Sequence, residues 1–234
     1  MKMTRHLIWL SIIFLAACAA PVASTPPATP TQPSSQTPTS TPTTAQSAPT
    51  TTDYFPEVPR GRTSEGYHYL GKADAPVTIT VYSDFLCTSC AIYTLDIEPR
   101  LIEEFVATGQ ARLVYRHLLQ LGERSQILSE ASECAADHGK FWELRRELYA
   151  RYNQLYFNTR ETVIDLAAGL GIPVDDFTTC LDSHTYQAQV EADYAAAMAE
   201  GIYARPVLRI GNETIIGAQR LEVYTQQIER AAQR

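Results

Sequence analysis

The sequence predicts an α/β fold in which a strand–helix–strand unit is followed by a block of helices, two further strands and a last helix. Residues 77–83 and 111–118 are mostly apolar and β-branched, as strands covered on both faces are. Apolar residues at helical spacing separate the two runs, which is the pattern of a parallel crossover unit. Residues 206–210 and 213–216 flank a Gly-Asn turn signal, which predicts a hairpin.

The remaining elements follow in chain order. A short strand is expected within 66–70, ended by Gly71. The first helix carries apolar residues from Ile92 to Phe105, and Pro99 is expected to kink it. Glycines and Asn158 divide the next part into separate helices. The expected helices of this inserted block, about 124–199, and the last helix are 125–138, 141–152, 162–170, 184–199 and 221–232.

Composition limits the class of protein. The chain has 234 residues, enough for one sizeable domain or a domain with an insert. Apolar residues make up 45% and charged residues 19%, which is ordinary for a globular protein. The net charge of −7 argues against nucleic acid as a partner, because its phosphates would be repelled.

Residues 1–18 have the pattern of a signal peptide. A basic start precedes an apolar run at 7–17, which is too short to span a bilayer. The run ends in Leu-Ala-Ala-Cys, which resembles the bacterial lipobox. This resemblance implies that Cys18 is acylated and becomes the mature N-terminus, and several acyl chains would anchor it stably. The alternative is a plain secretory signal in which the cysteine is incidental.

Residues 19–52 are expected to form a disordered tether. They consist almost entirely of Pro, Thr, Ser, Ala and Gln, without a charge. Such a segment cannot bury enough apolar surface to offset its ordering entropy, and its prolines favour extended conformations. The folded domain is therefore expected at 53–234, lifted off a membrane by the tether.

The folded part contains four cysteines, Cys87, Cys90, Cys134 and Cys180. An even number in an oxidising compartment suggests two disulfides. If Cys87 pairs with Cys90, Cys134 and Cys180 remain to form a structural disulfide within the helical block. Two buried free thiols are the alternative for that second pair.

The Cys87-x-x-Cys90 motif comes directly after a buried strand and opens a helix. Unpaired N–H groups and the helix dipole stabilise a thiolate at the first cysteine. The second lies one turn further on, where it can resolve a mixed disulfide. Cys87 is therefore the expected nucleophile and Cys90 the expected resolving thiol. Half of a zinc site and an inert structural bridge are the alternatives.

Three segments carry a resemblance to a known family. Residues 77–90, 134–149 and 201–207 resemble, in this order, the active-site segment, the helical insert and the cis-proline loop of the DsbA-like thioredoxin family. The resemblance implies a thioredoxin fold with a helical insertion, a cis Pro206 beside the cysteine pair, and a redox-active disulfide with no further cofactor and no metal. It also implies exported client proteins, a membrane partner that recycles the disulfide, and an extracytoplasmic location.

The sequence departs from the family's pattern at three places. Thr88 and Ser89 replace the Pro-His of strongly oxidising members, and Val81 stands where many members carry a buried acid. Arg205 stands where a small residue usually precedes the cis-proline. We expect Arg205 to place a positive charge near Cys87 and to give a moderately oxidising protein. The alternative is that Arg205 points to solvent or pairs with a surface acid.

Two further polar residues lie near the motif in sequence. Asp84 follows a strand, where an aspartate is typically a turn or cap residue, although a proton role for Cys90 is an alternative. His117 ends the second long strand, where a hydrogen-bonded structural histidine is the simpler interpretation.

The expected function is oxidation of cysteines in exported proteins, with reduction as the opposite direction of the same chemistry. A tethered binding or chaperone-like lipoprotein without turnover is the alternative from another class. Isomerisation is the third possibility, but residues 53–66 are too few for the dimerisation domain that isomerases of related fold carry.

Overall fold

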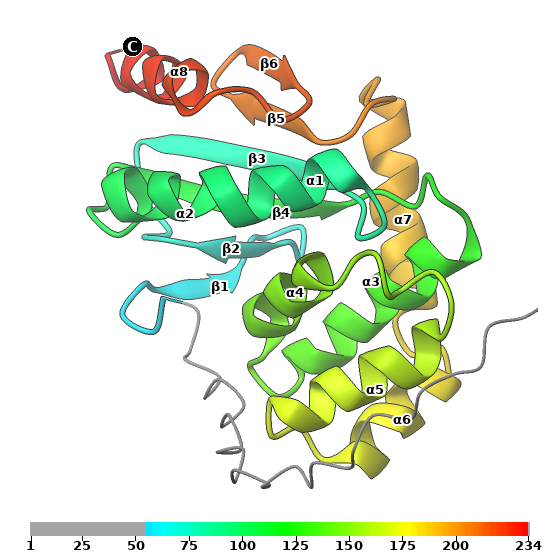
Figure 1. Ribbon diagram of the computed structural model, residues 1–234. Helices are drawn as coiled ribbons and strands as arrows, with labels where there is room; N and C mark the ends of the chain where they lie inside the picture. Colours follow the sequence, from blue (N-terminus) through cyan, green and yellow to red (C-terminus); the bar gives the residue numbers. More distant parts are fainter. Residues whose placement is uncertain (1–54, 234) are drawn as a thin grey trace, which may run out of the picture. The chain divides into compact units, whose positions relative to one another are not determined.

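The computed structural model describes residues 55–233, so the expectations for the signal peptide, Cys18 and the tether lie outside the described residues. A six-stranded mixed sheet with helices on both faces forms its centre (Figure 1). The expected α/β class with a helical insertion is confirmed. The strands, in the order β1-β2-β4-β3-β5-β6 across the sheet, are β1 (Arg60–Arg62), β2 (His68–Leu70), β3 (Val77–Ser83), β4 (Ala111–His117), β5 (Val207–Ile210) and β6 (Glu213–Ile216).

Strand β3 lies at the centre of the sheet. It pairs in parallel with β4 over its whole length and antiparallel with β5. Alternate residues of β3 point to opposite faces, so Ile79 and Val81 enter the main core while Tyr82 enters a smaller core on the other face. Because β3 has a hydrogen-bonded strand on each side, the loop after its carboxyl end starts from a firmly held position.

The segment after β3 is one helical run with two wider, π-helical turns. Pro99 lies in the first turn of α2, the position at which the missing N–H of a proline disturbs a helix least. Just before it, the Glu98 N–H donates to the Tyr93 carbonyl five residues back, so the expected irregularity at the proline takes the form of a widened turn. The four parts are α1 (Thr88–Ile92), η1 (Tyr93–Ile97), α2 (Glu98–Leu101) and η2 (Ile102–Val106).

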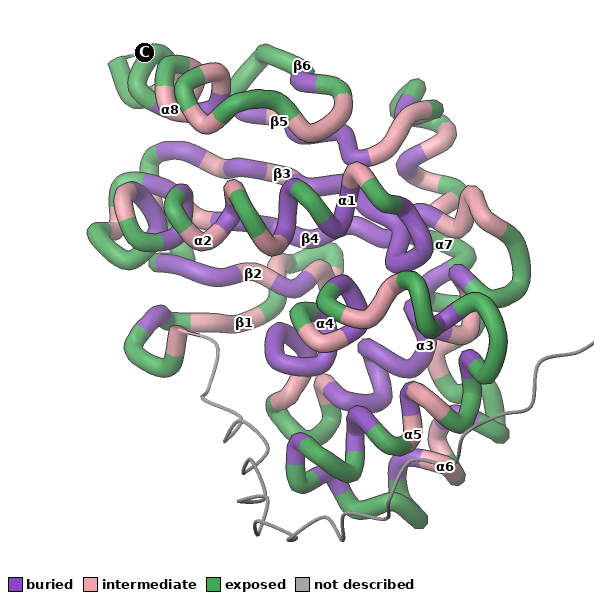
Figure 2. The backbone as a smooth tube through the Cα atoms, in the orientation of Figure 1, coloured by how far each residue is buried: buried purple, intermediate pink, exposed green. Residues whose placement is uncertain are grey.

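The last helix, α8 (Leu221–Ala232), has the bounds that the sequence predicts. It packs beside the α1–η2 run, and the Tyr93 and Tyr224 rings lie 5.6 Å apart. The opposite face of the sheet is covered by α7 (Gln187–Ala199), where Ala197 packs with Tyr82 and Val207. The carboxyl end of β3 is therefore enclosed by helices on both sides (Figure 2).

The inserted block runs from Glu123 to Ala199. Its first four helices are α3 (Glu123–Ala136), α4 (Phe141–Ala150), α5 (Thr159–Gly169) and α6 (Val174–Asp182). Helix α6 departs from the sequence prediction, which treated residues 171–173 as a break and expected no helix before residue 184. Pro173 is instead the N-cap of α6. Asp175 and Asp176 stabilise the first turn of this helix, and Phe177 and Leu181 are buried. Strand β1 was also not predicted.

A buried ion pair joins the block to the α1–η2 run. The Arg145 guanidinium in α4 donates to both Glu98 carboxylate oxygens, at 2.5 and 2.8 Å, and to the Thr94 hydroxyl at 3.2 Å. Both charged side chains are fully buried. Arg145 also lies over the Tyr115 ring, 4.7 Å from its centroid. Since a buried charge without a partner is costly, this pair fixes how α4 docks.

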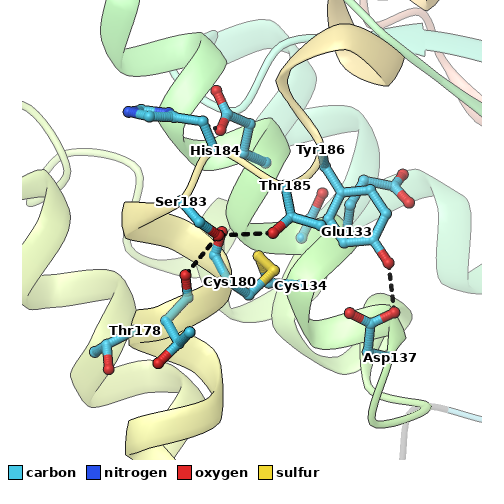
Figure 3. Close-up of a disulfide and its surroundings, with 12 residues drawn as sticks. Glu133, Cys134, Asp137, Thr178, Cys180, Ser183, His184, Thr185 and Tyr186 are labelled. Carbon is cyan, nitrogen blue, oxygen red and sulfur yellow. Dashed lines mark hydrogen bonds and ion pairs between the residues drawn. A yellow bond between two sulfur atoms is a disulfide. The ribbon is translucent and has the colours of Figure 1, made fainter.

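Cys134 of α3 and Cys180 of α6 form a disulfide with an S–S distance of 2.01 Å (Figure 3). The bond joins residues 46 positions apart within the helical block. On the same side of α3, the Tyr186 hydroxyl donates to the Asp137 carboxylate. Among residues 55–233 no helix combines the length and the apolar character that crossing a membrane requires.

We predict that the double variant Cys134→Ala/Cys180→Ala loses about 4 kcal/mol of its free energy of unfolding, because the disulfide restricts a long loop in the unfolded chain. Urea unfolding under oxidising conditions measures the loss. In a Cys87→Ser/Cys90→Ser background, which removes the redox-active pair, reduction is expected to lower the stability by a similar amount, and adding Cys134→Ala/Cys180→Ala should make the protein insensitive to the reductant. A loss of less than about 1 kcal/mol would contradict the prediction.

Candidate active site

The motif begins at the junction of β3 and α1. Cys87 is the N-cap of α1, with extended backbone angles of −89° and 118°. Its sulfur accepts a hydrogen bond from the Cys90 N–H at 3.3 Å. A sulfur at this position faces the unpaired N–H groups of the first helical turn, which favour negative charge. The arrangement is the one that the sequence predicts from a strand followed at once by the motif.

Asp84 holds the loop between Ser83 and Cys87 in place. One carboxylate oxygen accepts from the Leu86 N–H and the Ser125 hydroxyl, both at 2.9 Å. The other accepts from the backbone N–H groups of Gln120 and Leu121, at 3.0 and 3.2 Å. Burial raises the pKa of Asp84, while these hydrogen bonds oppose the rise. With four donors on a buried carboxylate, Asp84 has the turn-forming role.

The two thiols differ in their surroundings. Cys87 is 7% exposed and Cys90 is fully buried. A hydrogen bond from the Cys90 thiol, joined by the Cys90 N–H and the Arg205 charge, lowers the pKa of Cys87 to about 7 although burial opposes this. Burial raises the pKa of Cys90 well above its usual value. Near neutral pH a substantial fraction of Cys87 is therefore thiolate, while Cys90 stays a thiol.

The loop before β5 lies against Cys87. The Arg205–Pro206 peptide bond is cis, and the Arg205 carbonyl oxygen lies 3.9 Å from the Cys87 sulfur. Pairing of Val207 with Tyr82 brings this loop to the end of β3. The structure thus brings together Cys87, Cys90 and Pro206, as the resemblance implies.

The Arg205 side chain stays near the cysteine pair. Its guanidinium donates to the Gln120 side-chain oxygen at 2.7 Å, and the residue is half-buried. Thr88 is exposed and Ser89 half-buried in the first turn of α1. Cys134 and Cys180 are bonded to each other and far along the chain, so they supply no thiolates to a zinc site at the motif.

Several residues near the site gave no signal in the sequence. The Tyr156 hydroxyl donates to the Leu86 carbonyl at 2.6 Å, which ties the inserted block to the residue before Cys87. The Ser83 hydroxyl lies 2.6 Å from that of Tyr149. The His117 ring, by contrast, has the hydrogen-bonded role that the sequence favours, since its Nε2 lies 3.0 Å from a Glu133 carboxylate oxygen. These contacts join segments 16 to 70 residues apart, which no local pattern reveals.

The fold and the dithiol together define a class: this is a thioredoxin-fold thiol–disulfide oxidoreductase of the DsbA-like kind. A family model described as Thioredoxin matches residues 63–230. The chain belongs to this thioredoxin family, and the match includes the motif, the inserted helices and the cis-proline loop.

Named relatives agree with the class. Disulfide bond formation protein D of Bacillus subtilis is 28% identical over 156 residues, covering 64% of this chain and 70% of that protein. The crystal structure of oxidised BdbD from Bacillus subtilis has a TM-score of 0.64 and 25% identity, over 71% of this chain and 92% of the other. Wolbachia pipientis alpha-DsbA1 shares the fold, with a TM-score of 0.65 and 20% identity over 70% of this chain and 90% of the other.

A different kind of relative also matches. The Na(+)/H(+) antiporter NhaA of Herminiimonas arsenicoxydans is 32% identical over 165 residues, which is 69% of this chain. The chain spans 25% of the length of that antiporter, so the similarity concerns one part of it.

We predict that Arg205→Thr raises the pKa of Cys87 above its value of about 7, because a positive charge that favours the thiolate is removed. The Cys87 thiolate then forms at a higher pH than in the wild type, and the pH dependence of the alkylation rate shifts in the same direction. The ultraviolet absorbance of the thiolate measures the change. Arg209→Thr, in which an arginine paired with Glu200 is lost, is the control and should leave the titration unchanged. Equal titration curves for Arg205→Thr and wild type would disprove the charge effect.

Proposed function

We propose that the protein oxidises cysteine pairs of exported proteins through a Cys87–Cys90 disulfide. The observation that carries the proposal is the difference between the two thiols, with an acidic Cys87 at a helix N-terminus and a buried Cys90 of raised pKa. A stabilised Cys87 thiolate stabilises the reduced protein and makes its disulfide more oxidising. The printed name of the Bacillus subtilis relative, a disulfide bond formation protein, supports this direction.

The reaction exchanges one disulfide for another. A client thiolate attacks the Cys87 sulfur, the Cys87–Cys90 bond breaks, and Cys90 leaves and takes up a proton. A second thiolate of the client then attacks the client sulfur that is bonded to Cys87. The client disulfide forms, and Cys87 is released as a thiolate. The client loses two electrons, and the Cys87–Cys90 pair gains them. The Arg205–Pro206 loop, which touches the Cys87 sulfur, is the surface against which the client chain would lie.

Each turnover of the proposed reaction leaves Cys87 and Cys90 as thiols. A second oxidant must therefore restore the disulfide after each cycle. We propose a membrane redox partner for this step, and Cys87 as the thiol that it engages, because Cys90 is fully buried.

We predict that Cys90→Ser accumulates mixed disulfides, because its Cys87 thiolate can attack a client disulfide and no Cys90 thiol remains to release the client, whereas Cys87→Ser forms none. Non-reducing electrophoresis of exported proteins measures the adducts. The wild-type protein should reduce insulin or oxidise a dithiol peptide, and Cys87→Ser should be inactive. A wild-type protein that binds unfolded clients without any thiol exchange would instead favour the binding or chaperone-like alternative. Faster alkylation of Cys90 than of Cys87 would reverse the assigned roles.

We propose further that residues 1–18 are a lipoprotein signal peptide, that Cys18 is the lipidated N-terminus, and that residues 19–52 tether the domain to the outer side of the cell membrane. The Leu-Ala-Ala-Cys ending and the uncharged, proline-rich composition support this. An extracytoplasmic position also suits a protein that oxidises thiols.

We predict that Cys18→Ser releases a soluble form or leaves the precursor unprocessed. Fractionation of cells, together with mass spectrometry of the mature N-terminus, measures this. Cys87→Ser is the control, because it should remain lipidated and in the membrane fraction. A processed Cys18→Ser protein that stays in the membrane fraction would exclude anchoring through Cys18.

A further inference from the structure

Arg205 is a cation at the active site that has no carboxylate partner in the described part of the chain. It is half-buried, and its Nη1 donates to the neutral Gln120 side chain at 2.7 Å. Other arginines of the domain are matched with carboxylates, as Arg116, Arg145 and Arg209 are. A guanidinium carries five N–H donors, so most of the donors of Arg205 remain for a ligand.

Two contacts hold Arg205 against the cysteine motif. Its carbonyl oxygen lies 3.9 Å from the Cys87 sulfur. Its side chain reaches Gln120, whose backbone N–H donates to the Asp84 carboxylate at 3.0 Å, and Asp84 in turn accepts from the Leu86 N–H at 2.9 Å. The backbone and the guanidinium of Arg205 are therefore both attached to the loop that ends at Cys87.

Asp84 does not serve as the missing partner of Arg205. Its two oxygens accept four hydrogen bonds, from three backbone N–H groups and the Ser125 hydroxyl, and none of these donors belongs to Arg205. The Arg205 charge favours the ionised form of Asp84 through space, although burial raises the pKa of this carboxyl overall. The Arg205 donors thus stay unused by the nearest buried carboxylate.

Exposed aromatic rings mark the two loops that adjoin Cys87. Tyr203, two residues before Arg205, is 74% exposed, and Phe157 is 85% exposed. Phe157 follows Tyr156, whose hydroxyl donates to the carbonyl of the residue before Cys87 at 2.6 Å. Aromatic rings exposed around a reactive sulfur are typical of a surface that binds another chain. A client that reaches Cys87 along the loop before β5 therefore passes Arg205.

We propose that Arg205 determines client specificity by binding an aspartate or glutamate side chain that lies within two residues of the client cysteine. This inference rests on the proposed function and names the class of client that the site prefers. Residues of an extended chain are about 3.3 Å apart, so such a side chain stays close to the sulfur that Arg205 already contacts. The planar fork of a guanidinium matches a carboxylate through two parallel hydrogen bonds.

The preference is local to this cation. The net charge of −7 disfavours acidic clients at longer range, so only an acid placed to reach Arg205 gains from its charge. A lysine at the same client position is repelled. Acidic residues elsewhere in the client are expected to have no favourable effect.

The same cation serves two anions in turn. In the mixed disulfide the Cys87 sulfur carries no charge, so the guanidinium is available to the client carboxylate. When the client disulfide forms, Cys87 is released as a thiolate, and the client leaves with its carboxylate. The Arg205 charge then favours the Cys87 thiolate again. No proton moves to or from Arg205, because a guanidinium stays charged, and the electrons pass between sulfur atoms only.

The test is a cycle of protein and peptide variants. The oxidised protein reacts with capped peptides whose two cysteines are each flanked by Glu, Gln or Lys, placed one residue away in one set and two residues away in another. Chromatography after acid quenching gives the second-order rate of oxidation, divided by the rate of the same peptide with oxidised glutathione. In at least one set the wild type should oxidise the Glu peptide about threefold to tenfold faster than the Gln peptide, and the Lys peptide most slowly.

Arg205→Gln should make the Glu and Gln peptides equal. The ratio between peptides is the decisive measurement, because a changed pKa of Cys87 alters the rates for all peptides alike. Arg205→Lys keeps the charge without the fork and should retain part of the preference. Arg209→Thr, which removes an arginine paired with Glu200, is the matched control and should keep the wild-type ratio.

Three results bear against the inference or the function. Equal ratios in the wild type and Arg205→Gln would overturn the inference, as would a Glu preference that Arg209→Thr loses to the same extent. The rate with the Gln peptide shows whether each variant is folded and active. A wild-type protein that oxidises none of the peptides would instead contradict the proposed function.

Discussion

The active site depends on the hydrogen bonds that the buried carboxylate of Asp84 accepts. These four hydrogen bonds join the loop that carries Cys87 to the segment that opens the inserted block, from Gln120 to Ser125. The same segment holds the Arg205 guanidinium through the Gln120 side chain. One side chain at the end of a central strand therefore sets the position of the thiols, the insertion and the cis-proline loop relative to one another.

Local patterns predicted the elements that local forces determine. Strand β3 and helix α8 have the bounds expected from their β-branched run and their amphipathic spacing. Helix α6 was missed because a Gly-Ile-Pro sequence is typical of a break, whereas here the proline starts a new helix whose buried residues pack against α3 and α5. Strand β1 is three residues long and exists through its pairing with β2, which no periodicity indicates.

The active site likewise has parts that the local sequence predicts and parts that depend on distant contacts. The cysteine motif and the loop at Pro206 are visible in the sequence because they are short and ordered along the chain. The partners that hold them in place are not, since Tyr156 reaches the Leu86 carbonyl across 70 residues and Gln120 reaches Arg205 across 85. Contacts between residues so far apart in the chain depend on the whole fold and form no local motif.

The disulfide between α3 and α6 gives the protein an unusual dependence on its own kind of chemistry. Under the proposed function, a chain newly delivered across the membrane has Cys134 and Cys180 reduced and 46 residues apart, and it is then a client like any other exported protein. Copies that are already mature can oxidise it. Production of the mature protein would then be self-propagating: the capacity to close this bond grows with the number of molecules in which it is already closed.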